Sequence, residues 1–217
     1  LDESPEVFGL HSNANIDYET ANANNFVDTV LLMQPRVSGG KAAMTPEMII
    51  TNKTLEFLNM LPDVIDWSKA HKDTKREISE GVMISLGVFV KQEMERFNKL
   101  LREVKRNLSS LINAIKGTEV MSAKLENVFN SFMLNKVPDF WMDNNIGYPS
   151  LKPLASWIKD LVDRIEFIGN WVVSGPPNTF WVAAFFFPQG FMTATMQTYA
   201  RSTGKPIDTL GFKTHVM

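Results

Sequence analysis

The most regular pattern in the chain is a helical alternation of apolar and polar residues between Glu77 and Lys116. Its apolar residues recur at steps of three and four, which places them on one face of a helix. They are Phe89, Phe97, Leu100, Leu101, Val104, Leu108, Leu111, Ile112 and Ile115. The pattern predicts one long amphipathic helix, with Gly81 or Gly87 as the candidate position for a bend. Gly117 is expected to end it, because glycine accepts the left-handed conformation that closes a helix.

Three further segments combine helical periodicity with residues that cap helix starts. Thr45, Ser122 and Ser150 are the predicted N-caps, and Pro46 and Glu47 strengthen the first of them. The predicted ends are about Leu61, Pro138 and Gly175-Pro176-Pro177. The expected core residues are Ile49, Leu55, Leu58 and Leu61; Leu125, Val128, Phe129 and Phe132; and Trp157, Leu161, Ile165, Ile168 and Trp171. Together with the long helix, these segments predict a mainly α fold, a helical bundle.

The two ends of the sequence show weaker patterns. Residues 1–36 are predicted to be a connector, with one short helix over Asn25 to Gln34 that Pro35 ends. At the other end, Leu210, Phe212, Thr214 and Val216 alternate with other residues at the period of a strand with one buried face. Residues 207–217 are therefore expected to be a first strand whose partners lie beyond Met217. Residues 37–206 between these ends form the predicted helical part.

No charged residue occurs between Phe167 and Ala200. Gly175-Pro176-Pro177 and Pro188-Gln189-Gly190 interrupt this stretch, so it offers no run near the ~20 apolar residues that a bilayer requires. The sequence therefore favours a buried helix, or a helix pair bent at Pro188, over a membrane span.

Composition excludes several classes of function. A net charge of −2, from 22 basic and 24 acidic residues, gives no attraction to nucleic acid or anionic lipid. Cysteine is absent, which removes disulfides and thiolate chemistry and suits a reducing compartment. No apolar leader precedes the chain, so we expect a cytoplasmic protein without nucleic-acid or membrane partners.

The candidate chemical motifs are weak. Gly39-Gly40-Lys41 resembles part of a phosphate-binding loop, but Pro35 and Ala42 occupy positions where that motif needs glycine and a hydroxyl residue. The isolated histidines are His11, His71 and His215. A carboxylate-rich helix segment holds Asp160, Asp163, Arg164 and Glu166, which we interpret as a solvated charged face. The sequence therefore predicts no catalytic residue, no cofactor-binding residue and no metal ligand.

A charge-free aromatic block is the candidate contact site. It comprises Trp171, Trp181, Phe185, Phe186, Phe187 and Phe191. Without interleaved Lys or Arg it does not suit base stacking on a nucleic acid. Two interpretations stay open, an interface to another domain and an internal core.

Several ordered motifs resemble the C-terminal region of dynein heavy chains, after the last AAA+ module. The matching segments are Pro5-Glu6-Val7-Phe8-Gly9-Leu10-His11, Gln34-Pro35-Arg36, Gln92-Glu93-Met94-Glu95-Arg96-Phe97-Asn98, Ala114-Ile115-Lys116-Gly117, Tyr148-Pro149-Ser150-Leu151-Lys152-Pro153-Leu154 and Phe185-Phe186-Phe187-Pro188-Gln189-Gly190-Phe191. The last two are similar to axonemal dyneins. Ala183-Ala184 departs from a Ser-Gly pair in these relatives, and Val82 to Val90 fits the pattern loosely, which leaves the inner- or outer-arm subtype open.

The resemblance implies a helical segment that packs on the AAA+ ring and leads into a β-barrel-like end. ATP and magnesium would bind earlier modules of the parent protein, and the implied partners are AAA+ ring modules of that protein, dynein intermediate and light chains, and microtubules. The implied location is the axoneme of cilia and flagella, and the implied role is structural and regulatory. The alternative is a free-standing helical adaptor that binds partner helices in an amphipathic groove.

Overall fold

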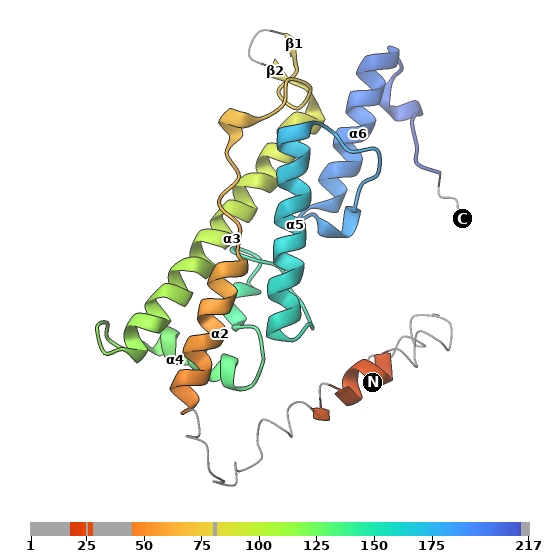
Figure 1. Ribbon diagram of the computed structural model, residues 1–217. Helices are drawn as coiled ribbons and strands as arrows, with labels where there is room; N and C mark the ends of the chain where they lie inside the picture. The colour runs from red at the N-terminus through yellow and green to blue at the C-terminus, as the bar shows by residue number, and fades with distance from the viewer. Residues whose placement is uncertain (1–17, 25, 28–44, 80–81, 214–217) are drawn as a thin grey trace.

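The computed structural model describes residues 18–24, 26–27, 45–79 and 82–213, and these are mainly helical (Figure 1). The helices are α2 (Pro46–Met60), α3 (Ser85–Ile115), α4 (Ala123–Met133), α5 (Leu154–Ser174) and α6 (Pro188–Thr203). Strands β1 (Glu77–Ser79) and β2 (Val82–Met83) form a small antiparallel sheet. Short 3-10 turns are η2 (Trp67–Lys69), η3 (Asp139–Trp141), η4 (Val182–Ala184) and η5 (Ile207–Thr209). Residues 18–24 and 26–27 are also helical, so the described part of the predicted connector contains a helix, which begins before the predicted start at Asn25. The rest of that connector and Gly39-Gly40-Lys41 lie outside the described residues.

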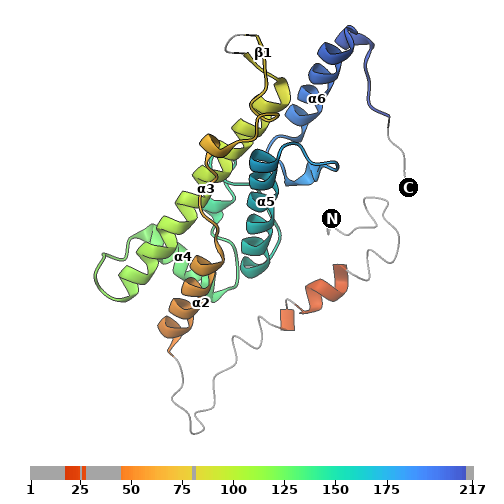
Figure 2. The ribbon, with the colours of Figure 1, turned by 45° about the horizontal axis from the view of Figure 1, so that its top comes forward.

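Helix α3 is the central element of the bundle. It contacts α2, α4, α5 and α6, which lie around it in both views of the ribbon (Figures 1 and 2). All of its predicted apolar positions from Phe89 to Ile112 are buried, and Ile115 is partly buried. Burial of one large apolar side chain stabilises a fold by roughly 1.5–3 kcal/mol. The amphipathic stripe on α3 therefore forms the centre of one continuous core to which α2, α4, α5 and α6 also contribute.

The start of this helix was predicted incorrectly. Glu77–Ser79 and Val82–Met83 are the paired strands β1 and β2, and α3 begins only at Ser85. Gly87 lies in the first turn of α3, not at an interior position where it would bend a longer helix. An added Cβ there would lie 2.3 Å from the backbone oxygen of Thr74, so glycine is needed for a close approach between α3 and the preceding loop. Gly81 lies outside the described residues.

The capping prediction for α2 is confirmed, whereas its predicted core face is partly wrong. The Thr45 hydroxyl accepts a hydrogen bond from the N–H of Met48 (3.3 Å), and Pro46 occupies the first helical position. Leu55 is exposed, and the buried positions on the helix are Ile50, Thr54 and Phe57. Thr54 is tolerated in the core because its hydroxyl donates to the carbonyl oxygen of Ile50 (2.7 Å).

The predicted start of α4 is confirmed, but that of α5 is shifted. Ser122 caps α4 by accepting from the N–H of Leu125 (3.3 Å). Ser150 instead accepts from the N–H of Lys152 (3.1 Å) in a turn, and α5 starts at Leu154. Pro153 explains the shift, because a residue before proline is forced out of the helical conformation. The predicted apolar stripe of α5, from Trp157 to Trp171, is buried throughout.

The uncharged stretch forms the end of α5, the turn η4 and the start of α6. Gly175 ends α5 with a φ of 93°, and Pro188 is the first residue of α6 rather than a bend within a helix. Within the described residues, no helix combines the length and apolar character needed to cross a bilayer.

The β-barrel-like C-terminal portion is not supported. Ile207–Thr209 form the turn η5, and residues 210–213 are not in a strand. In the described part of the chain the only sheet is the β1–β2 pair. A strand needs a neighbour to satisfy its backbone groups, and no described strand lies beside this segment. The remainder of the predicted strand, residues 214–217, lies outside the described residues.

Candidate functional site

Half of the aromatic block lies in the core. Trp171, Phe185 and Phe191 are 2%, 5% and 6% exposed. The Phe185 ring centroid lies 5.0 Å from that of Phe191 and 6.1 Å from that of Trp171. Phe89 of α3 contacts Phe185 edge to face, with centroids 5.0 Å apart. These rings join the loop before α6 to α3 and α5, so their interpretation as internal core fits the structure.

The other half of the block reaches the surface. Phe187 is 52% exposed and Trp181 is 38% exposed. Phe186 is partly buried. Its ring centroid lies 4.5 Å from that of Phe97, and the Arg96 guanidinium lies 5.3 Å from it, over the ring. Trp181 packs edge to face on Phe167, with 6.3 Å between the ring centroids. The block therefore combines buried anchors with two exposed aromatic side chains.

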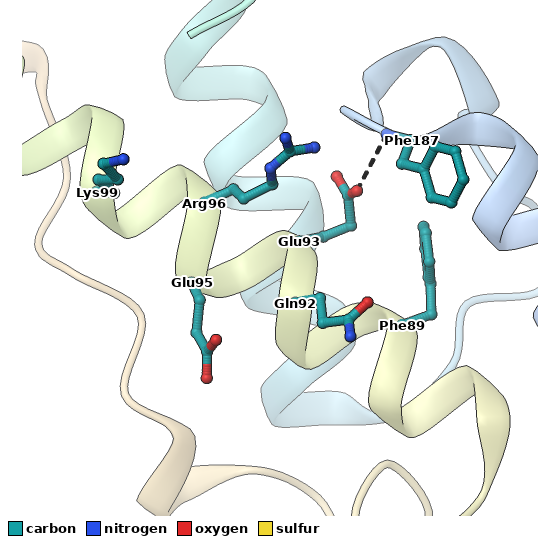
Figure 3. Close-up of a pocket in the computed structure, with 7 residues that line it drawn as sticks. All are labelled: Phe89, Gln92, Glu93, Glu95, Arg96, Lys99 and Phe187. Atoms are coloured by element: carbon teal, nitrogen blue, oxygen red, sulfur yellow. Dashed lines mark hydrogen bonds between the residues drawn. The ribbon is translucent and has the colours of Figure 1, made fainter. Parts of the chain in front are cut away.

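Glu93 is the polar residue that positions this loop. It lies on α3 and is 2% exposed. Its Oε2 accepts a hydrogen bond from the N–H of Phe186 (2.7 Å), and its Oε1 accepts one from the N–H of Phe187 (3.1 Å; Figure 3). Phe187 is the N-cap residue of α6, where a carboxylate satisfies free N–H groups and suits the helix dipole. Burial raises the pKa of Glu93 in spite of these two hydrogen bonds.

Sequence reasoning did not single out Glu93, although a signal was present. Phe89, Glu93 and Phe97 follow one another at steps of four, so the glutamate occupies a core position of the α3 stripe. A carboxylate at such a position is costly unless it is hydrogen-bonded. The spacing alone therefore indicated a structural or functional partner for Glu93.

Asp160 corrects the interpretation of the carboxylates on α5. It is 5% exposed rather than solvated, and it accepts hydrogen bonds from Lys152 Nζ (2.6 Å), Arg164 Nε (2.7 Å) and Tyr148 Oη (3.1 Å). Burial raises the pKa of Asp160, but the hydrogen bonds and charges of Lys152 and Arg164 outweigh it, so the pKa lies below its usual value. Asp163 and Glu166 are exposed as expected.

Arg164 connects the Asp160 cluster to the aromatic block. Its Nη1 donates to the carbonyl oxygen of Ala183 in η4 (2.7 Å). Its guanidinium lies over the Tyr148 ring at 4.5 Å and over the Trp181 ring at 5.3 Å. Arg164 therefore contacts both the indole of Trp181 and the backbone of η4, much as Glu93 binds the backbone of Phe187.

Two shallow hollows flank the loop. One, of about 390 Å³, is lined by Phe89, Gln92, Glu93, Glu95, Arg96, Lys99 and Phe187. Figure 3 shows Glu93 and Phe187 facing one another while Glu95 points away. The other, of about 460 Å³, includes both Arg96 and Arg164. Aromatic rings and guanidinium groups around an open hollow are typical of protein-binding surfaces.

The remaining candidates are the histidines, of which only His71 lies in the described part of the protein. His71 Nδ1 accepts from the N–H of Asp73 (3.2 Å), and its ring packs under Gly175. His11 and His215 lie outside the described residues. Among the residues that are described, no group of three or more His, Asp and Glu side chains is arranged to hold a metal ion.

Comparison with known proteins agrees with the motifs. Residues 20–217 match the family of C-terminal domains of dynein heavy chains. The sequence is 39% identical over 217 residues to human dynein axonemal heavy chain 6, an alignment that covers 100% of this chain and 5% of that protein. It is 40% identical over 212 residues to human dynein axonemal heavy chain 3, which covers 98% of this chain and 5% of that protein.

A rat relative shows a comparable identity and coverage. Rattus norvegicus dynein axonemal heavy chain 12 is 37% identical over 215 residues, which is 99% of this chain and 7% of that protein. The chain thus spans 5–7% of the length of these relatives. On this similarity over nearly its whole length, the chain belongs to the family of C-terminal domains of dynein heavy chains.

Proposed function

We propose that these residues form a non-catalytic structural and regulatory segment of an axonemal dynein heavy chain. The parent would be an ATP-driven, minus-end-directed microtubule motor in the axoneme of cilia and flagella. ATP and magnesium would bind other modules of that motor, and intermediate chains, light chains and microtubules would be partners of the whole complex. This segment would pack on the AAA+ ring and couple the movements of its modules.

The observation that carries this proposal is the pair of exposed aromatic side chains, Trp181 and Phe187, on a loop that is packed tightly against α3 and α5. Large exposed aromatic residues beside arginines are characteristic of the centres of interfaces. Glu93 and Arg164 fix the backbone beneath them, and the buried rings of Phe185 and Phe191 anchor the loop to α3 and α5. A close-packed base transmits a displacement instead of absorbing it.

Substitutions in the parent heavy chain test this proposal. Trp181→Ala and Phe187→Ala remove exposed rings and leave the buried anchors in place. Tyr199→Ala is a matched control, because Tyr199 is 50% exposed and lies farther along α6. We expect the double variant to keep basal ATPase activity while its microtubule-stimulated ATPase and gliding velocity change. If every motor parameter equals that of the control, the segment is a passive appendage or a free-standing adaptor.

A further inference from the structure

The hollow of about 460 Å³ beside the loop before α6 contains two arginines, Arg96 and Arg164, and its described lining contains no carboxylate. We call it the arginine hollow. Its walls come from α3, the turn before α5, α5 itself and the loop from η4 to α6. Its size falls within the ~300–1,000 Å³ of typical small-molecule sites. Because four packed segments meet there, its walls are fixed relative to one another.

Aromatic rings hold both guanidinium groups in place. The Arg96 guanidinium lies 5.3 Å from the centroid of Phe186, and that of Arg164 lies 4.5 Å from the centroid of Tyr148. The two rings are themselves packed edge to face, with centroids 5.8 Å apart. A cation that already rests on an aromatic ring loses less side-chain freedom when it binds a ligand. The two arginines are therefore positioned on neighbouring rings before any ligand arrives.

Both arginines keep hydrogen-bond donors for a ligand. Arg96 is exposed and forms neither an ion pair nor a hydrogen bond with any residue that the structure describes. Arg164 uses Nε for Asp160 and Nη1 for Ala183, and its Nη2 has no hydrogen-bond partner within the described ranges. Figure 3 shows Arg96 on the same side of α3 as Glu93, while Glu95 points away.

The carboxylates that interact with these arginines are buried. Glu93 and Asp160 are 2% and 5% exposed. Both oxygens of Glu93 accept backbone N–H groups of the loop before α6, and the oxygens of Asp160 accept from three side chains. Neither carboxylate lines the arginine hollow. The charge that this hollow presents to solvent is therefore positive, which attracts anions.

The arrangement suits a phosphate group better than a carboxylate. A carboxylate is satisfied by the fork of one guanidinium, whereas a phosphate has three terminal oxygens and can accept from two guanidinium groups at once. The exposed ring of Phe187 also lines the hollow. An aromatic face beside a phosphate site can stack on a nucleobase.

We propose that the arginine hollow binds the phosphate group of a small soluble compound. Arg96 donates to its oxygens from α3, and Arg164 donates from α5. The compound is either inorganic phosphate or a nucleoside phosphate whose base stacks on Phe187. This site is built from side chains of the 217 residues alone, so it does not rest on the proposed coupling role.

Isothermal titration calorimetry of the 217-residue chain tests this proposal. The probes are inorganic phosphate, adenosine monophosphate and, for the carboxylate alternative, glutamate. Arg96→Gln removes one guanidinium at an exposed position. Arg102→Gln is the matched control, because Arg102 is an exposed arginine of α3 that does not line the hollow. Circular dichroism and urea unfolding establish that each variant has the fold and stability of the wild type.

We expect phosphate to bind at millimolar concentration or below. Arg96→Gln should weaken binding about tenfold, the effect of losing charge-assisted hydrogen bonds from one side chain, and Arg102→Gln should leave it unchanged. Tighter binding of adenosine monophosphate that falls to the level of phosphate in Phe187→Ala identifies a nucleoside phosphate as the ligand. Equal affinity for the two probes identifies phosphate alone.

Three results overturn the proposal. They are no binding of either phosphate probe at millimolar concentration, equal losses for Arg96→Gln and Arg102→Gln, and glutamate binding as tight as that of phosphate. The coupling role is decided separately, by the motility of the Trp181 and Phe187 variants of the heavy chain.

Discussion

The carboxylate of Glu93 and the backbone N–H of Phe186 are joined by a hydrogen bond of 2.7 Å across 93 residues of sequence. This contact, with the second one to Phe187, connects the central helix α3 to the start of α6. It holds the exposed ring of Phe187 at a fixed place on the bundle. The stability of the chain and the presentation of its aromatic surface therefore depend on the same buried side chain.

Glu93→Ala is expected to destabilise the protein by roughly 2–4 kcal/mol, since it leaves two backbone donors unpaired. Glu93→Gln is expected to cost less, because its amide oxygen still accepts one of the two hydrogen bonds and no charge is buried. Urea unfolding monitored by circular dichroism gives both values. The control is Glu95→Ala, an exposed glutamate on the same helix, which should change stability by at most about 0.5 kcal/mol. Equal losses for Glu93→Ala and Glu95→Ala would contradict the account.

The raised pKa of Glu93 predicts a specific pH dependence. The folded chain holds this proton more tightly than the unfolded chain, whose glutamate titrates near 4.5. The contribution of Glu93 therefore lowers stability as the pH rises from 4.5 through the raised pKa, and stays constant above it. Comparing wild type with Glu93→Gln in urea unfolding from about pH 4 to about pH 8, a range of ordinary buffers around that titration, isolates this slope. A difference between the two proteins that is the same at every pH would contradict it.

Asp160→Asn is expected to destabilise the protein by about 2–4 kcal/mol, because Arg164 then loses the charge that compensates its burial. The lowered pKa of Asp160 means that its stabilising contribution is present above its ordinary pKa of 3.8 and is lost as the pH falls through the depressed value. At a pH below the depressed pKa of Asp160, the thermal unfolding temperature of the variant should therefore approach that of wild type. Asp163→Asn, the same change at an exposed position of α5, is the control and should be nearly neutral. Similar losses for both variants would refute the assignment.

Two glycines should respond in opposite directions to alanine. Gly87→Ala places a Cβ 2.3 Å from the Thr74 carbonyl oxygen, a backbone atom, and should cost about 1–3 kcal/mol. Gly169→Ala in α5 places its Cβ 3.7 Å from the Cγ1 atom of Ile65, an ordinary contact, and should gain up to about 1 kcal/mol from helix propensity. Differential scanning calorimetry of the two variants decides the order. A stabilised Gly87→Ala would show that the close approach to Thr74 is not required.

Helical periodicity and capping chemistry were sufficient to predict most of the bundle. The stripes on α3 and α5 have enough apolar positions that burying any other face would cost more, so local pattern and tertiary packing agree there. On α2 the pattern is weaker, and packing against α3 selects the face with Ile50, Thr54 and Phe57. Thr54 was not recognised as a core residue because its pairing with the Ile50 carbonyl appears only once the helix is formed.

The polar residues of the candidate site were the hardest to predict. Asp160 resembles its solvated neighbours until the turn before α5 brings Lys152 and Tyr148 to it. Asn98 on α3 is a second case. Its side-chain amide accepts from the N–H of Ile65 and donates to the carbonyl oxygen of Ile65 (2.8 Å each), a partner 33 residues away. Such partners are set by tertiary structure, so the sequence identifies an unusual polar position without identifying what satisfies it.

The most direct test of the central claim is hydroxyl-radical footprinting of Trp181 and Phe187. We predict that both side chains oxidise readily in the isolated 217-residue protein and are protected in the intact heavy chain, where the AAA+ ring would cover them. Trp141, which is 0% exposed, should remain protected in both samples and so verifies that the isolated protein is folded. Equal oxidation of Trp181 and Phe187 in the two samples, with Trp141 protected throughout, would contradict the claim that this surface packs on the ring.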